Sequence, residues 1–167
     1  MSEYMIELQE EEYQEMGSLN HSIVQAQITG LLYPDERFRI MVELSLDASQ
    51  IDLSQFGLKT KDELKPDICL YQGRRELSIP DDILKMTEMP LLAIEVLSPT
   101  QTIGDILAKF KAYFALGVKS CWLVTPLIKA ITIYSQPSHF KTFGMETTEV
   151  IDEVLDIHLP IQKVFGW

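Results

Sequence analysis

Apolar and polar residues follow two different spacings along this chain, which predicts a protein built from both strands and helices. Apolar runs of strand length are rich in Ile, Val and Leu, and the polar stretches 47–65 and 73–90 between them predict loops. Weaker strand signals occupy residues 148–157. The runs that we interpret as strands are "RFRIMVELSL" (37–46), "PDICLYQ" (66–72), "LLAIEVL" (91–97), "SCWLV" (120–124) and "AITIYS" (130–135).

Helical spacing of apolar residues is found in two longer segments, 19–33 and 103–117. Ser18 is a suitable N-cap for the first predicted helix. Thr102 and Asp105 have the spacing of a capping box at the start of the second, with Asp in place of the usual Glu. Both helices therefore have recognisable starts in the sequence.

The order of these elements, α-β-β-β-α-β-β, predicts an α/β fold with a central mixed β-sheet flanked by helices. Residues 80–86, "PDDILKM", could form a short helical turn, and the chain ends in a short amphipathic segment, 159–167. We expect a single domain over residues 1–167, because the chain has the usual length of one domain and no repeats or low-complexity linkers. An acidic N-terminal segment, 1–16, would lead into the first helix.

Composition narrows the class of protein without identifying it. The chain is 46% hydrophobic, which is enough for a sizeable core. Cys69 and Cys121 both lie in apolar runs, so we interpret them as buried free thiols in a reducing cytoplasm. The N-terminal residues lack the basic and apolar regions of a signal peptide, and no apolar stretch reaches the roughly 20 residues that span a bilayer. We therefore expect a cytoplasmic protein with no membrane partner.

Charge is distributed unevenly along the chain. The formal net charge of −11 argues against a simple nucleic-acid-binding protein, because phosphates and acidic surfaces repel each other. No lysine or arginine precedes Arg37, whereas the segment from Leu97 to Lys141 holds five lysines and one acid, Asp105. This basic segment either forms ordinary solvated surfaces or supplies contacts to a nucleic-acid backbone.

The residues that could carry chemistry are carboxylates, because the chain lacks the common nucleotide-binding, serine-hydrolase and zinc motifs. Glu95 lies in the middle of an apolar run, where an unpaired charge is costly. Asp67 follows Pro66 at the start of another predicted strand. If the two strands are neighbours, both acids converge at one edge of the sheet, and such an all-oxygen site suits Mg²⁺ or Mn²⁺. The alternatives are that Glu95 faces solvent or pairs with a lysine, and that Asp67 caps a turn.

The same residues carry a resemblance to a known family. "KPDICLY" (65–71), "LLAIEVLSPT" (91–100) and "DILAKFKAYFALGVKSCWLV" (105–124) resemble motifs of the Uma-two family of bacterial proteins. This family belongs to the restriction-endonuclease-like superfamily with the PD-(D/E)XK core. "NHSIVQAQITGLL" (20–32) is similar to the family's first helix, which often carries a histidine where this chain has His21.

The resemblance implies a restriction-endonuclease-like core with a metal-dependent phosphodiesterase site. Asp67 and Glu95 would be the acids that bind Mg²⁺ or Mn²⁺, and His21 is a further candidate catalytic residue beside them. The superfamily's usual lysine, two residues after the acid, falls at Leu97 in this chain. The family instead has a lysine on the following helix, which is Lys109 here.

The interpretation that follows is a magnesium-dependent nuclease that hydrolyses phosphodiester bonds in nucleic acid, with DNA as the expected partner. A homodimer would suit it, since many such nucleases cut two strands with two sites. Two features depart from the family pattern: Thr125-Pro126 replaces a frequent Asp-Pro, and the chain is strongly acidic. The alternative is a non-catalytic binding module that retains the nuclease-like fold, and metal binding would distinguish the two.

Overall fold

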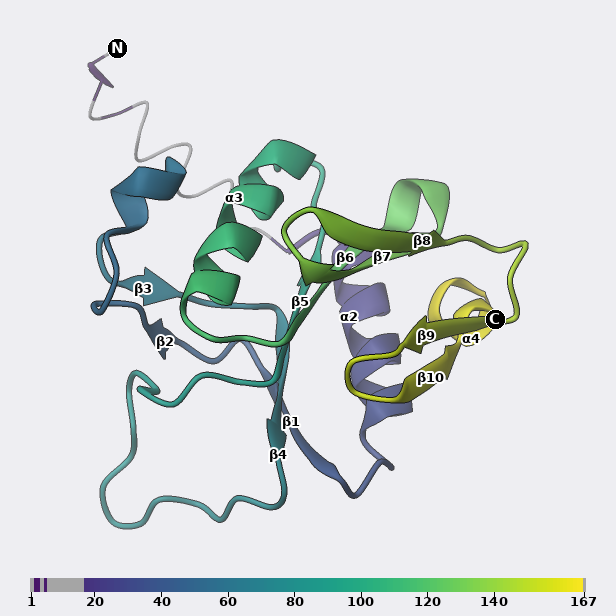
Figure 1. The fold of residues 1–167 in the computed structure, drawn as a ribbon, viewed down its shortest axis with the longest axis horizontal. Coiled ribbons are helices and arrows are strands. Elements are labelled where there is room, and N and C mark those ends of the chain that lie inside the picture. The colour runs from purple at the N-terminus through teal and green to yellow at the C-terminus, as the bar shows by residue number, and fades with distance from the viewer. Residues whose placement is uncertain (1, 4, 6–16, 167) are drawn as a thin grey trace.

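The computed structural model of the protein describes residues 2, 3, 5 and 17–166. The predicted acidic segment 1–16 therefore lies almost wholly outside the described residues. A six-stranded mixed sheet forms the centre of the fold (Figure 1). The spatial order of the strands is β1-β4-β5-β6-β7-β8. Their bounds are β1 (Phe38–Val42), β4 (Ile68–Gln72), β5 (Leu92–Val96), β6 (Ser120–Thr125), β7 (Ala130–Gln136) and β8 (His139–Phe143).

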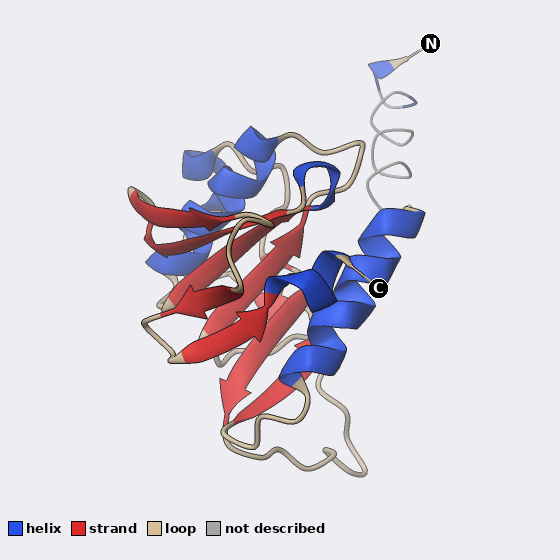
Figure 2. Cartoon of the chain, turned by 90° about the vertical axis from the view of Figure 1, so that its right-hand side faces the viewer, coloured by secondary structure: helices blue, strands red, loops and turns tan. Residues whose placement is uncertain are grey.

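The neighbouring strands β5 and β6 are parallel, and the other neighbouring pairs of this sheet are antiparallel. The helix α3 (Ile103–Ala115) makes the crossover between the two parallel strands. Helices lie on both faces of the sheet, with α2 (Leu19–Leu32) and the short α4 (Ile161–Phe165) together on the face opposite α3 (Figures 1 and 2). The predicted α/β fold with a central mixed sheet and flanking helices is confirmed.

Strand β5 is buried on both faces, which explains its nearly continuous apolar sequence. Leu92, Ile94 and Val96 pack into the core on the side of α2, whereas Ala93 packs into the core on the side of α3. Because side chains alternate along a strand, Glu95 faces the same side as Ala93. The acid that interrupts the apolar run is therefore placed under α3.

The helix starts agree with the predicted caps. The Ser18 hydroxyl accepts a hydrogen bond from the His21 N–H at 3.1 Å. At the start of α3, the Thr102 side chain accepts from the Asp105 N–H, and the Asp105 carboxylate accepts from the Thr102 N–H, each at 3.1 Å. These caps fix the positions of the side chains in the following turns, including His21 and Lys109.

Smaller elements complete the fold, and several differ from the sequence-based prediction. A pair of two-residue strands and the helix η1 occupy much of the stretch 47–65 that was predicted as a loop. The weak strand signals at 148–157 correspond to the hairpin of β9 and β10, and the helix η2 follows β6. The bounds are β2 (Leu46–Asp47), η1 (Leu53–Phe56), β3 (Glu63–Leu64), η2 (Pro126–Ile128), β9 (Glu149–Asp152) and β10 (Ile157–Pro160).

Two predictions of local structure are wrong. The predicted strand 37–46 ends at Val42, because Glu43 takes a left-handed backbone conformation with φ of 50°. The predicted helical turn at 80–86 is absent from the structure, which describes this whole segment. Met86 instead forms a parallel β-bridge with Leu46.

The hairpin β9–β10 is tied to the sheet by Asp152, a fully buried acid. Its Oδ2 atom accepts hydrogen bonds from the Ser120 hydroxyl at 2.6 Å and from the Trp122 indole N–H at 2.8 Å. Its Oδ1 atom accepts from the backbone N–H groups of Val154 and Leu155 at 2.9 and 3.2 Å. Four donors therefore satisfy this carboxylate, which explains how a buried acid is tolerated.

Other expectations about the core and surface can be checked directly. Cys69 and Cys121 are free and buried, as expected. Trp122 is also buried in the core. Among the described residues, no helix has the length and apolar character needed to cross a membrane.

Candidate active site

Asp67 and Glu95 are brought together by the pairing of their strands. Strands β4 and β5 are antiparallel with Ile68 opposite Ile94, so one more step along the register places Asp67 opposite Glu95. The Asp67 Oδ2 atom accepts a hydrogen bond from the Val96 N–H at 2.7 Å. The predicted convergence of the two acids at one edge of the sheet is therefore confirmed.

The Glu95 side chain lies in an almost closed environment. The residue is 2% exposed, and its Oε1 atom accepts a hydrogen bond from the Tyr113 hydroxyl of α3 at 2.7 Å. Burial raises the pKa of the Glu95 carboxyl to about 8; the Lys109 charge and the Tyr113 hydrogen bond oppose this rise, and the Asp67 carboxylate adds to it. Without a cation beside it, Glu95 therefore holds a proton at neutral pH. The alternative that Glu95 faces solvent is wrong.

His21 belongs to the same cluster, from the first turn of α2. Its Nε2 atom lies 3.1 Å from Asp67 Oδ2. The hydrogen bond to Asp67 raises the pKa of the His21 imidazole, burial opposes the rise, and the charges of Asp67 and Glu43 add to it. This environment favours the imidazolium form relative to a solvated histidine, and the contact with Asp67 becomes an ion pair when the imidazole is protonated.

The backbone of Asp67 is fixed as firmly as its side chain. Its carbonyl oxygen accepts hydrogen bonds from the Gln25 side-chain amide at 3.1 Å and from the Glu43 N–H at 3.0 Å. No sequence motif identified Gln25 as a site residue. The one sequence feature that could have identified it is its position four residues after His21, which places both side chains on one face of the helix.

Lys109 lies one turn before Tyr113 on α3 and is half-buried. Its charge lowers the pKa of Glu95, although no ion pair within 4.0 Å joins the two side chains in the part of the chain that the structure describes. Asp105, four residues before Lys109, could pair with it on the helix surface, but no such ion pair is found there, because the Asp105 carboxylate turns back to cap the helix. Leu97 packs against the core below α3, so the superfamily's usual lysine position is apolar here.

The two acids fit a hard divalent cation better than zinc. Their side chains lie within hydrogen-bonding reach of each other, an arrangement that needs either a shared proton or a cation. No group of three or more His, Cys, Asp or Glu side chains that could hold a metal is found within the described ranges. Mg²⁺ is commonly bound by one or two carboxylates and keeps several water ligands, whereas zinc sites require more nitrogen or sulfur ligands. Asp67 and Glu95 would be the protein ligands.

The structure thus places all four predicted site residues, Asp67, Glu95, His21 and Lys109, around one edge of the sheet. It adds the Tyr113 hydroxyl, which contacts Glu95, and the Gln25 amide, which contacts Asp67. The cluster therefore combines two acids, two basic side chains and a buried hydroxyl.

Comparisons with known proteins give an independent view of the chain. Residues 2–162 match the model of the Uma2 family, which is described as "Putative restriction endonuclease". The fold is similar to a crystal structure from Anabaena variabilis, described as "a putative nuclease belonging to DUF820", with a TM-score of 0.68 and 22% sequence identity over 90% of this chain and 82% of that chain. None of the curated proteins matches. Since the family model covers nearly the whole sequence, the chain belongs to the Uma2 family of restriction-endonuclease-like proteins.

Proposed function

We propose that this protein is a Mg²⁺- or Mn²⁺-dependent nuclease that hydrolyses phosphodiester bonds in nucleic acid, with DNA as the first substrate to test. The observation that carries the proposal is the placement of Asp67 opposite Glu95, with the half-buried Lys109 beside them. Membership of a family described in terms of restriction endonucleases supports the same reaction class.

The proposed roles follow from what each side chain contacts. Asp67 and Glu95 would hold the cation, which when bound polarises a phosphate oxygen and lowers the pKa of a bound water. The Tyr113 hydroxyl fixes one oxygen of Glu95, and the Val96 N–H fixes one oxygen of Asp67. Each acid therefore keeps its second oxygen for the cation.

The two basic side chains divide the remaining work. Lys109 has a compact charge on a flexible stem, which suits a group that orients water or stabilises negative charge on the phosphate in the transition state. The His21 Nε2 atom is already bound to Asp67, so we assign this residue to positioning the acid. The Gln25 amide supports the same acid through its backbone carbonyl.

The test is a cleavage assay on single- and double-stranded DNA and RNA, with Mg²⁺, Mn²⁺ or EDTA. We expect cleavage that requires the metal and that Asp67→Asn and Glu95→Gln abolish. Nucleic-acid binding without cleavage, whichever metal is present, would instead favour the non-catalytic module. The apolar Leu97 at the usual lysine position supports that alternative. Failure of Mg²⁺ and Mn²⁺ to bind at all would contradict the proposed site.

A further inference from the structure

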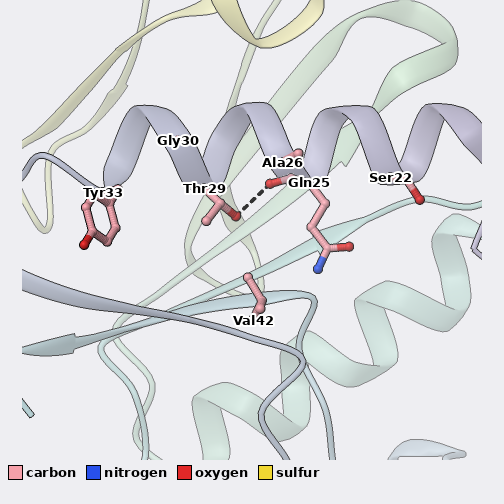
Figure 3. A pocket seen from close by; sticks show the side chains of 7 residues that line it. All are labelled: Ser22, Gln25, Ala26, Thr29, Gly30, Tyr33 and Val42. Atoms are coloured by element: carbon pink, nitrogen blue, oxygen red, sulfur yellow. Dashed lines mark hydrogen bonds between the residues drawn. The ribbon is translucent and has the colours of Figure 1, made fainter. Parts of the chain in front are cut away.

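A shallow groove runs along α2, on the side of the helix that faces β1 (Figure 3). Ser22 and Tyr33 lie near its two ends, and the Gln25 side chain extends from the helix towards Val42. None of the lining residues is charged, although the chain carries a net charge of −11. The lining residues are Ser22, Gln25, Ala26, Thr29, Gly30, Tyr33 and Val42.

The groove is linked to the candidate active site through Gln25. Gln25 lines it and at the same time donates from Nε2 to the Asp67 carbonyl. The Gln25 Oε1 atom accepts no hydrogen bond from the described residues and is not buried, so it is available to a ligand. His21, one helical turn before Gln25, contacts the Asp67 carboxylate. A molecule bound at the two acids would therefore meet the groove as it leaves the site.

The chemistry of the lining selects the kind of ligand. A duplex is normally gripped through its phosphates by lysines and arginines, and the lining has neither. An uncharged amide, two hydroxyl side chains and an aromatic ring instead suit a neutral, planar group with hydrogen-bonding edges. Tyr33 is 69% exposed, which leaves its ring open for stacking. Unpaired nucleobases have these properties and stack on aromatic side chains, whereas the phosphates of such a strand would lie outside this uncharged lining.

We propose that this groove binds unpaired bases of the nucleic-acid substrate, next to the phosphodiester that is cleaved. The inference rests on the proposed nuclease function and specifies its substrate as single-stranded or locally unpaired. Helix rise is about 1.5 Å per residue, so the twelve residues from His21 to Tyr33 span roughly 18 Å. Stacked bases are about 3.4 Å apart, so this length accommodates a few nucleotides.

Gly30→Leu is the decisive variant, because it fills the groove without touching the acids. A Cβ atom added at Gly30 meets nothing within 4 Å, and leucine is a better helix former than glycine, so the variant should fold. We expect kcat/KM for a single-stranded oligonucleotide to fall about tenfold or more. Hydrolysis of bis(4-nitrophenyl) phosphate, a phosphodiester without bases, should change less than about twofold.

Tyr33→Ala tests the stacking platform independently. Loss of one base–aromatic contact should lower oligonucleotide affinity by about fivefold to a hundredfold. Phe140→Ala is the matched control, since this aromatic residue of β8 is 62% exposed and lies outside the groove lining. Its oligonucleotide affinity should stay at the wild-type value.

Several results would overturn the groove proposal. Unchanged oligonucleotide cleavage in Gly30→Leu would do so, and so would an equal loss with both substrates, which would indicate damage to the active site itself. A change of oligomeric state in size-exclusion chromatography would identify the groove as an interface between copies of the chain.

Failure of the proposed function can be told apart from failure of the groove. If the wild-type protein cleaves neither substrate, no nuclease activity exists to be affected. Fluorescence anisotropy with a labelled single strand then decides: weaker binding by Gly30→Leu and Tyr33→Ala, but not by Phe140→Ala, supports the groove. Equal binding by all three variants, or a preference for intact duplex, contradicts it.

Discussion

The Asp67 carboxylate accepts the hydrogen bond of the Val96 N–H at 2.7 Å, directly beyond the last registered pair of β4 and β5. A side chain thus takes the place that a backbone carbonyl would have in a continuing ladder. This contact explains why the two acids meet: the residue that precedes Val96 is Glu95, and its partner across the sheet is Asp67. Glu95 is therefore held within the paired strand β5, and Asp67 is held directly before β4 by its own contact with Val96.

The first prediction concerns pH and stability in the absence of metal. The folded-state pKa of Glu95 is about 8 against an ordinary value of 4.5, so the folded protein binds the extra proton between these values. The contribution of Glu95 to the free energy of unfolding should therefore be greatest below about pH 4.5. It should decrease by up to about 1.4 kcal/mol per pH unit as the pH rises through 8. Urea unfolding in EDTA at pH 5, 6, 7 and 8 measures this slope.

Glu95→Gln is the control for the pH slope. The amide resembles the protonated acid in shape and charge, so we expect nearly wild-type stability at pH 6 and a flatter dependence above it. The raised pKa of His21 acts in the same direction, since its stabilisation is complete below the ordinary value of 6.5 and is lost as the pH rises through its folded value. A residual slope should therefore remain in Glu95→Gln, and His21→Gln should reduce it. Equal slopes in wild type and Glu95→Gln would show that Glu95 does not carry a proton.

The second prediction concerns metal and stability. Millimolar Mg²⁺ or Mn²⁺ should raise the thermal midpoint, because a ligand that binds the native state alone stabilises it by mass action. The increase should be larger at pH 8 than at pH 6, since the cation must displace the proton of Glu95. Differential scanning fluorimetry can measure the increase in the thermal midpoint and its dependence on pH. Glu95→Gln should abolish the response, and a response that survives this change would place the cation elsewhere.

The two acids of the candidate site could be predicted because they break local patterns. Glu95 interrupts an apolar run and Asp67 follows a proline at a strand start, so each was visible without knowledge of the fold. Their pairing then depended only on which strands are neighbours. The roles of these acids, of Lys109 and of His21 stay predictions until activity is measured.

Other features could not be predicted, because they arise from contacts between distant segments or from exposed strands. Strand β8 was missed because it is an edge strand in which Phe143 is the single buried residue, so no apolar alternation marks it. The prediction of a helical turn at 80–86 was wrong because its apolar residues Ile83 and Leu84 have no core to pack against and are 48% and 85% exposed. The groove exists only through the packing of α2 beside β1, which the sequence of neither element specifies.

The third prediction concerns Asp152, whose carboxylate is buried with four donors. Asparagine has one acceptor oxygen, so either orientation of its amide leaves one pair of donors facing an NH₂ group. We expect Asp152→Asn to lower the free energy of unfolding by about 2 kcal/mol or more, with tryptophan fluorescence near Trp122 as the probe. Ser120→Ala removes a single donor and should cost about 1 kcal/mol. An effect of Asp152→Asn no larger than that of Ser120→Ala would contradict the anchoring role.

The fourth prediction concerns the position of the lysine that we propose to be catalytic. Lys109 is half-buried near Glu95, whereas Lys111 is exposed on the same helix, so the two residues form a matched pair. Lys109→Met should keep the fold and the metal response but lower kcat by about a hundredfold or more, the scale of losing one transition-state donor. Lys111→Met makes the same change in net charge and should cost far less. Wild-type cleavage by Lys109→Met would end the assignment.

Relocation of the charge gives the sharper form of this test. Leu97 lies two residues after Glu95, at the superfamily's usual lysine position, and packs below α3. A lysine there would emerge from the same strand as the acid, and its long stem can lie along apolar surface while the amine reaches the sheet edge. Leu97→Lys combined with Lys109→Ala should therefore recover part of the activity that Lys109→Ala loses. If the double variant folds, binds Mg²⁺ and still shows no recovery, the contribution of Lys109 depends on its place on α3 and not only on its charge.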